Sequence, residues 1–443
     1  MLGVADAGKP ERAANEIVRV LVIDIGQQSV WDILDRLDML GAELEQPGGR
    51  SLQRRAVLKS YKDSGVHYGG HSYSRFERRE RHTAIHPIRP VCMKRTVQSA
   101  MDNPMGAGVD ELKAAMTKPF EDSFGRRIDY VRLSVTDRCD LRCRYCMAEH
   151  MQFVPKREIL TLEEMAALAD ILIERGVRKI RLTGGEPLVR KGVMQLIRSL
   201  GMRLGSGLDE LVLTTNGTRL EHFALELRGA GIERINVSLD SLRPERFGHI
   251  TRGGDLRQVL RGIDSALSAS LAVKINMVAL AGINEDEIEE MLRWCSAMAI
   301  DLTLIETMPL GEIEEDRTDH YLPLDGVKSR LEKRFTLVPS TKRTGGPARY
   351  FDVIELGSCL GLITPLTNNF CDGCNRIRIA ATGTVFGCLG HDQRVELRDS
   401  LRGGGVEAVN LLLDQLMAGK PRKHDFRIGG APAVARHMSV TGG

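Results

Sequence analysis

The pattern of hydrophobic and polar positions changes character near residue 120. Beyond it, short β-rich runs are each followed by a segment with apolar residues at every third or fourth position, the period of an amphipathic helix. These runs predict strands at Tyr130–Val135, Lys179–Leu182, Glu210–Leu213, Arg234–Leu239, Val273–Val278 and Leu302–Glu306. Helices are predicted between successive strands, among them Thr161–Arg175 and Val193–Leu204.

The first predicted helix has a clear beginning, because Thr161 followed three residues later by Glu164 matches a capping box. Six strands that each lead into a helix imply parallel strands joined by right-handed crossovers. Six units are too few for a closed eight-stranded barrel. The sequence therefore predicts an α/β fold, a partial (β/α)6 TIM-like barrel that binds ligands at the C-terminal ends of its strands.

Past about Arg334 this alternation stops, and Thr344–Pro347 has the composition of a turn or linker. A shorter β-rich region and a helix near Val406–Met417 follow. We expect this C-terminal region to be an α+β extension. The predicted domains are an unmatched N-terminus at 1–115, the barrel core at 116–335 and the extension at 336–443.

The first 115 residues sustain neither a helical nor a strand period, and 50–95 are rich in Arg, His, Ser and Gly. Such a segment lacks the apolar face that offsets ordering entropy, so we expect much of it to be disordered. Its arginine cluster at residues 75–81 is only weak evidence for RNA binding. The break in composition also suggests Met116 as the initiator.

Composition narrows the class of protein. The chain of 443 residues is 42% hydrophobic and 27% charged, which is typical of globular proteins. Its net charge of +3 is too small to indicate nucleic acid or an anionic membrane as a partner. No apolar run is long enough to cross a bilayer, and the start lacks the apolar core of a secretory signal. An odd count of nine cysteines favours a reducing compartment, so we expect a cytoplasmic location.

Six of the cysteines form two tight groups. Cys139, Cys143 and Cys146 have the spacing C-x3-C-x2-C directly after the first predicted strand, and they supply three thiolates with no clear fourth ligand except His150. A structural zinc site is normally closed by four protein ligands. An iron–sulfur cluster with one open iron is therefore favoured, and a zinc knuckle stays an alternative.

The second group consists of Cys371, Cys374 and Cys388, again three thiolates. Soft sulfur ligands suit zinc or an iron–sulfur cluster, and taken alone this spacing favours zinc slightly. Beside the first group, a second open cluster becomes the better interpretation. Cys92, Cys295 and Cys359 match no cluster position, and we expect them to be buried or incidental.

Polar and cationic residues accompany the predicted strands. Gly184 and Gly185 would let a ligand approach the backbone, and the carboxylate of Glu186 could hold an ammonium group. Taken alone, however, the motif is better explained as an ordinary glycine turn. Planar guanidinium groups bind phosphate oxygens in pairs, so a cationic set could hold a triphosphate. That set comprises Arg132, Arg181, Lys274, Arg376 and Arg378.

Longer sequence motifs narrow the choice of protein family. They are Phe124–Arg126, Arg132–Cys139, Arg181–Leu188, Val237–Asp240, Asn369–Arg378 and the terminal Gly442–Gly443. Together they resemble the GTP 3′,8-cyclases (molybdenum cofactor biosynthesis protein A), a family within the radical S-adenosylmethionine enzymes. The resemblance covers about 116–443 and leaves the first 115 residues unmatched.

The resemblance implies a 4Fe-4S cluster on the first cysteine group, whose open iron binds S-adenosylmethionine. The residues implied to contact this cofactor are Tyr145, Gly185, Ser238 and Met308. A second 4Fe-4S cluster on the other group would hold the guanine of GTP. The residues implied to bind GTP are Arg132, Arg181, Thr214, Lys274, Arg376 and Arg378. Gly442 and Gly443 would insert into the active site.

The implied reaction is that of a lyase, which converts GTP into (8S)-3′,8-cyclo-7,8-dihydroguanosine 5′-triphosphate in the first step of molybdenum cofactor biosynthesis. Flavodoxin or ferredoxin would supply electrons, cyclic pyranopterin monophosphate synthase would act next, and a homodimer is an option. Thr303 departs from the family pattern, since many relatives carry an arginine there. Two alternatives remain: a peptide-modifying radical enzyme and a zinc-stabilised RNA-binding protein.

Overall fold

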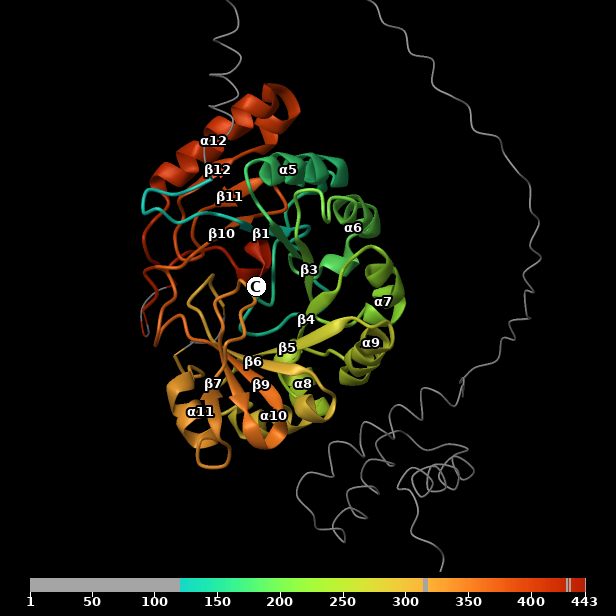
Figure 1. Ribbon diagram of the computed structural model, residues 1–443, viewed down its shortest axis with the longest axis vertical. Coiled ribbons are helices and arrows are strands. Elements are labelled where there is room, and N and C mark those ends of the chain that lie inside the picture. The colour runs from blue at the N-terminus through green and yellow to red at the C-terminus, as the bar shows by residue number, and fades with distance from the viewer. Residues whose placement is uncertain (1–119, 314–317, 428, 430–431, 443) are drawn as a thin grey trace, which may run out of the picture. The chain divides into compact units, whose positions relative to one another are not determined.

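One sheet of twelve strands organises the described part of the computed structural model, residues 120–442 without 314–317, 428 and 430–431 (Figure 1). Predictions for 1–115, Met116, Cys92 and Gly443 lie outside these residues. The strand order is β12-β11-β10-β1-β2-β3-β4-β5-β6-β9-β8-β7. Its first six strands in chain order are β1 (Tyr130–Ser134), β2 (Lys179–Thr183), β3 (Glu210–Thr215), β4 (Arg234–Ser238), β5 (Ala272–Ala279) and β6 (Asp301–Glu306).

All six predicted strands are present within two residues of their predicted bounds, and each pairs in parallel with the next. Helices follow them along the outer side of the sheet (Figure 1). These helices are α5 (Leu162–Glu174), α6 (Val193–Gly201), α7 (Leu220–Gly229), α8 (Pro244–Thr251), α9 (Leu256–Ser268) and α10 (Ile288–Ala297). Thr161 and Glu164 form the predicted capping box at the start of α5. The predicted α/β partial barrel is confirmed.

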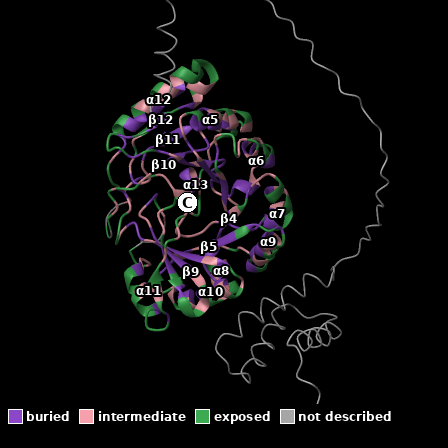
Figure 2. Cartoon of the chain, viewed as in Figure 1, coloured by how far each residue is buried: buried purple, intermediate pink, exposed green. Residues whose placement is uncertain are grey.

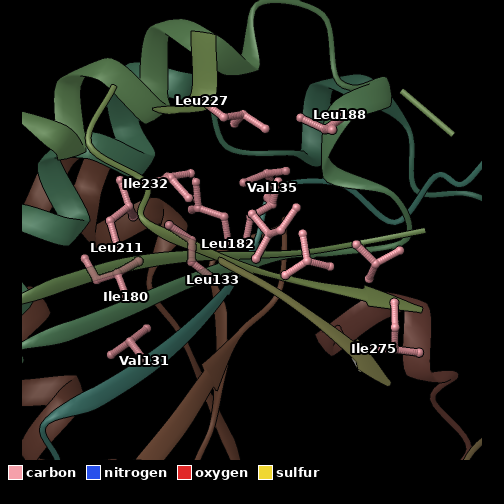
Figure 3. Packing of buried hydrophobic residues seen from close by; sticks show 14 of the residues in the cluster. Val131, Leu133, Val135, Ile180, Leu182, Leu188, Leu211, Leu227, Ile232 and Ile275 are labelled. Atoms are coloured by element: carbon pink, nitrogen blue, oxygen red, sulfur yellow. The ribbon is translucent and has the colours of Figure 1, made fainter. Parts of the chain in front are cut away.

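Alternation along the strands separates an apolar face from a polar one. Val131, Leu133, Ile180 and Leu182 point to the helix side, where they pack with residues such as Leu227 of α7 (Figure 3). Side chains at the intervening positions point to the inner side. Burial is continuous through the strands, while the outer surfaces of the helices are exposed (Figure 2). The core therefore lies between sheet and helices and leaves the inner face free for polar groups.

The C-terminal region extends both edges of the same sheet, a placement that the sequence did not indicate. Strand β9 pairs in parallel with β6, and β10 pairs in parallel with β1, so eight neighbouring strands run parallel. Its strands are β7 (Leu337–Pro339), β8 (Arg349–Val353), β9 (Ser358–Ile363), β10 (Arg376–Ile379), β11 (Thr384–Phe386) and β12 (Arg394–Glu396). Helix α11 (Leu324–Leu331) lies between β6 and β7, and helices α12 (Gly405–Gly419) and α13 (Met438–Thr441) follow β12.

Among the described helices, none has both the length and the apolar character that crossing a bilayer requires.

Candidate active site

The strand register sets cationic side chains in a row on the inner face. Arg132 of β1 is paired with Arg181 of β2 on one side and with Arg378 of β10 on the other. Two residues earlier on β1, Tyr130 is paired with Lys179 and Arg376. Because paired residues in parallel strands point to the same face, residues distant in sequence form one basic surface.

This surface is one wall of a cavity of about 1040 Å³, a volume that includes its open mouth. Of the six residues expected to bind GTP, the cavity is lined by Arg132, Arg181, Lys274, Arg376 and Arg378. Thr214 is not a lining residue, but its Oγ1 accepts a hydrogen bond from Arg181 Nη1 at 2.9 Å. All three cysteines of the second group line the same cavity, as does Met308.

No aspartate or glutamate belongs to the described residues that line the cavity. Burial, together with the charges of Arg132 and Arg376, holds the pKa of Arg378 well below its usual value. Burial and neighbouring arginines also lower the pKa of Lys274 to about 7. Buried positive charge without anionic partners is unfavourable. This arrangement indicates a polyanionic ligand.

Tyr130 is a lining residue that the sequence analysis missed. Arg181 Nε donates a hydrogen bond to its hydroxyl group at 2.5 Å. Burial alone would raise the pKa of Tyr130, but Arg181, Arg132 and Lys179 outweigh it and lower the pKa to about 7. Its position two residues before Arg132 on a strand was the available signal. The other missed lining residues include Phe370 and the stacked pair His424 and Phe426, whose ring centroids lie 4.3 Å apart.

We expect binding of a triphosphate to weaken as pH rises above about 7. Lys274 and Tyr130 each lose a proton near that pH, and either loss makes the cavity less positive. A single linked proton changes affinity by at most about tenfold per pH unit. The KM for GTP, measured between pH 6.5 and 8.5 at saturating S-adenosylmethionine, should therefore increase.

The matched control is Lys274→Arg, because arginine keeps its charge over this pH range. In this variant the KM for GTP should rise less with pH than in the wild type. A wild-type KM that does not change across the range would contradict the assignment of both groups to the anion site.

The first cysteine group lies on the loop after β1, where it meets the loops after β2 and β3. Burial and the charges of Glu186, Asp140 and Cys146 raise the pKa of the Cys139 thiol to about 12. Burial also raises the pKa of Cys143, and both other thiols of the group contribute. The three thiols are thus close enough to interact electrostatically. From the loop after β3, Asn216 Nδ2 lies 3.7 Å from Cys139 Sγ.

The second cysteine group also brings its thiols together. Burial raises the pKa of Cys371 and Cys388, and the charge of Cys374 contributes to both shifts. Burial would raise the pKa of Cys374, but Arg376 and Lys420 outweigh it and lower the pKa. Within the described residues, no three Cys, His, Asp or Glu side chains converge on a single metal ion. Zinc needs its sulfur ligands at about 2.3 Å.

Three of the residues expected to contact S-adenosylmethionine lie on the cysteine loop or at the C-terminal ends of β2 and β4. Tyr145 donates a hydrogen bond to Asp240 Oδ2 at 2.8 Å, which orients the loop against the end of β4. Ser238 is the last residue of β4. Gly185 packs on the backbone of the cysteine loop, since a Cβ atom there would lie 2.3 Å from the carbonyl oxygen of Arg138.

Glu186, which the sequence suggested could hold an ammonium group, also has partners within the protein. It is fully buried, and its oxygens accept hydrogen bonds from Thr215 Oγ1 at 2.9 Å and from the Asn216 amide at 2.6 Å. A further bond comes from the Leu188 amide. These bonds join the loop after β2 to the loop after β3.

The end of the chain enters the basic surface. Arg378 Nη1 donates a hydrogen bond to the Gly442 carbonyl oxygen at 2.7 Å. Gly442 has φ +71°, and a Cβ atom there would lie 2.1–2.8 Å from the side chain of Thr183. Only glycine fits at this position without displacing the tail.

We expect Gly442→Ala to reduce GTP turnover roughly 10- to 100-fold, from strain of about 1–3 kcal/mol at a positive φ together with the collision. Cleavage of S-adenosylmethionine should persist, because the first cysteine group is untouched. Gly282→Ala is the matched control, since Gly282 has φ +69° and open space around it. Equal activity of the two variants would contradict a role for the tail.

Comparison with known proteins agrees with this geometry. Residues 133–295 match the Radical SAM superfamily, and residues 300–426 match Molybdenum Cofactor Synthesis C. GTP 3′,8-cyclase of Sinorhizobium medicae is 55% identical over 350 residues, which is 78% of this chain and 99% of that protein. The enzyme of the same name from Rhizobium meliloti is 56% identical over 346 residues, 76% of this chain and 99% of its own. The chain belongs to the GTP 3′,8-cyclase family.

Family membership confirms the resemblance and sets aside the zinc-stabilised RNA-binding alternative. Among solved structures, Streptococcus suis SuiB bound to S-adenosylmethionine aligns at a TM-score of 0.48 with 12% identity, covering 79% of this chain and 83% of that one. Thr303, the departure from the family pattern, is fully buried, and its hydroxyl has no partner among the described residues.

Proposed function

We propose that this chain cyclises GTP to (8S)-3′,8-cyclo-7,8-dihydroguanosine 5′-triphosphate, the first step of molybdenum cofactor biosynthesis. The observation that carries the proposal is the cavity, which combines three cysteines with a row of buried cations and has no carboxylate among its described lining residues. A triphosphate supplies the negative charge that such a wall requires. A peptide substrate would not, which disfavours the peptide-modifying alternative.

Cys139, Cys143 and Cys146 are proposed to hold a 4Fe-4S cluster. When bound, the cluster and S-adenosylmethionine supply reductive cleavage of the cofactor and removal of a hydrogen atom from the ribose. The protein residues around the cluster and S-adenosylmethionine hold the reacting groups in position. Proposed contacts to the cofactor come from Tyr145, Gly185, Ser238 and Met308.

Cys371, Cys374 and Cys388 are proposed to hold the second 4Fe-4S cluster, with the guanine beside it. Arg132, Arg181, Thr214, Lys274, Arg376 and Arg378 are proposed to bind GTP, with Thr214 acting through Arg181. Anchoring the nucleotide at both ends fixes the ribose between the two cysteine groups. The tail at Gly442, with Gly443 beyond the described residues, narrows the site and helps to exclude water.

Further assignments complete the proposal. We assign 116–335 to the radical core and 336–443 to the second cluster and GTP. Flavodoxin or ferredoxin would donate electrons, and cyclic pyranopterin monophosphate synthase would use the product. A cytoplasmic location is part of the proposal, because an odd count of nine cysteines favours a reducing compartment. A homodimer remains part of the proposal.

The test is anaerobic reconstitution followed by incubation with GTP, S-adenosylmethionine and dithionite. We expect about eight irons per chain, four for each 4Fe-4S cluster, and the cyclised triphosphate as the product identified by mass spectrometry. Zinc without iron, or cofactor cleavage without any change in GTP, would overturn the proposal.

A further inference from the structure

A buried group of ionic side chains lies behind the second cysteine group, outside the residues assigned to GTP or cofactor. It consists of Asp122, Arg126 and Lys420, the C-cap residue directly after α12. Asp122 Oδ2 lies 2.7 Å from Arg126 Nε and 3.8 Å from Lys420 Nζ. The side chains of Asp122 and Lys420 are 0% and 1% exposed, and that of Arg126 is 8% exposed. We call this set the ionic cluster.

Both cations of the ionic cluster contact the segment that carries the cysteines. Lys420 Nζ lies 3.6 Å from Cys374 Sγ, within hydrogen-bonding distance for sulfur. Arg126 Nη1 donates to the Cys371 carbonyl oxygen at 2.8 Å. The stem of Lys420 also lies against Gly387, the residue before Cys388. Each cysteine segment of the second group is therefore in contact with the ionic cluster.

Arg126 further holds the segment after α12 in place. Its guanidinium donates to the carbonyl oxygens of Pro421 and Arg422 at 2.8 and 2.7 Å. These two hydrogen bonds fix the backbone directly after Lys420. The fixed backbone in turn holds the Lys420 ammonium group toward Cys374. A flexible surface lysine has no comparable constraint.

The charges within the ionic cluster do not balance. Two cations face one carboxylate in a site closed to solvent, and surplus buried charge is costly unless an opposite charge lies nearby. The surplus is directed at the three thiols of the second group. A 4Fe-4S cluster with three thiolate ligands carries net negative charge, which is increased by one-electron reduction.

We propose that the ionic cluster sets the reduction potential of the second iron–sulfur cluster, with Lys420 as a positioning and tuning residue that donates a hydrogen bond to Cys374 Sγ. Hydrogen bonds and positive charge at ligand sulfurs stabilise the reduced cluster and raise its potential. Asp122 opposes this effect and limits it. This inference rests on the proposed assignment of Cys371, Cys374 and Cys388 to a 4Fe-4S cluster.

A purely structural role for the ionic cluster would lead to a different result. Loss of any member would then loosen the cysteine segments, and every variant would lose iron without a consistent change in potential. Electrostatic tuning instead requires shifts of opposite sign when Lys420 or Asp122 is neutralised.

The experiment uses the full chain with Cys139, Cys143 and Cys146 all replaced by alanine, so that iron and EPR signals come from the second cluster alone. Redox titrations followed by EPR then compare Lys420→Met, Lys420→Arg and Asp122→Asn in that background. We expect Lys420→Met to disfavour reduction by about tenfold, equivalent to about 59 mV for one electron. Lys420→Arg should stay near the parent potential, and Asp122→Asn should shift it in the opposite direction.

Arg422→Met is the matched control. Arg422 follows Lys420 by two residues, but its side chain is 72% exposed and pairs with Asp372, so its loss should not change the potential. Unchanged potentials in Lys420→Met and Asp122→Asn, or shifts of the same sign, would overturn the inference. If Lys420→Met does not fold, the sign of the change in reduction potential in Asp122→Asn alone tests the inference. A parent background without about four irons per chain would instead refute the second cluster itself.

Discussion

Replacement of Cys139 by alanine is expected to abolish cleavage of S-adenosylmethionine and, with it, all turnover of GTP. The residue begins the first thiol group, and with only two thiolates left the proposed cluster loses one of its protein ligands. No other described cysteine is in a position to replace it, since Cys295 and Cys359 are buried elsewhere in the fold. The measurement is 5′-deoxyadenosine by chromatography after incubation with dithionite, with iron content expected to fall by about half.

Two further variants make this result specific. Cys295→Ala changes a buried cysteine on α10 and should keep both clusters and activity. Cys388→Ala should retain cleavage of the cofactor by the first group while GTP stays unconverted. Detectable 5′-deoxyadenosine from Cys139→Ala at the wild-type rate would show that the first group is not the site of cofactor cleavage.

Removal of Arg376 or Arg378 should have the second-largest effect, on GTP alone. Each side chain is 8% exposed and lines the cavity. Truncating one partner of a buried charge pair costs about 3–5 kcal/mol. Because each 1.4 kcal/mol corresponds to a factor of ten, we expect kcat/KM for GTP to fall roughly 100- to 4000-fold in Arg376→Ala and in Arg378→Ala. Cofactor cleavage should continue largely uncoupled from GTP.

Arg402→Ala provides the surface control, since Arg402 pairs with Glu164 at a partly exposed position on the outer side. Arg376→Lys keeps a charge but loses the planar fork, so its kcat/KM should lie between those of the alanine variant and the wild type. Normal cyclisation of GTP by both alanine variants would refute the phosphate-binding role of the basic surface.

Local patterns predicted much of this fold. The six core strands and helix α5, with its capping box at Thr161, were evident from periodicity and capping chemistry alone, because both depend on residues close together in sequence. The two cysteine groups were equally evident from spacing. The positions of the C-terminal strands in the sheet were not evident from the sequence. Strands β9 and β10 join opposite edges of the sheet by pairing with β6 and β1, and no local signal specifies such partners.

The same division holds within the candidate site. Arg376 and Arg378 could be placed on one strand face, but only the register of β10 against β1 brings them beside Tyr130 and Arg132. Tyr130 was missed because its hydroxyl acquires its role from Arg181 on the neighbouring strand. The sequence did not show that Glu186 accepts hydrogen bonds from Thr215 and Asn216, because these partners lie about 30 residues away on the loop after β3.

The sequence by itself determined which residues form strands and helices and which cysteines belong together, since side-chain periodicity and ligand spacing are properties of short segments. Only the tertiary structure decided what those segments face. Parallel pairing aligned arginines from three strands on one cavity wall that has few carboxylates. The fold also places Lys420, which follows α12, beside Cys374, 46 residues away in sequence. These juxtapositions depend on packing between distant segments, which no local pattern encodes.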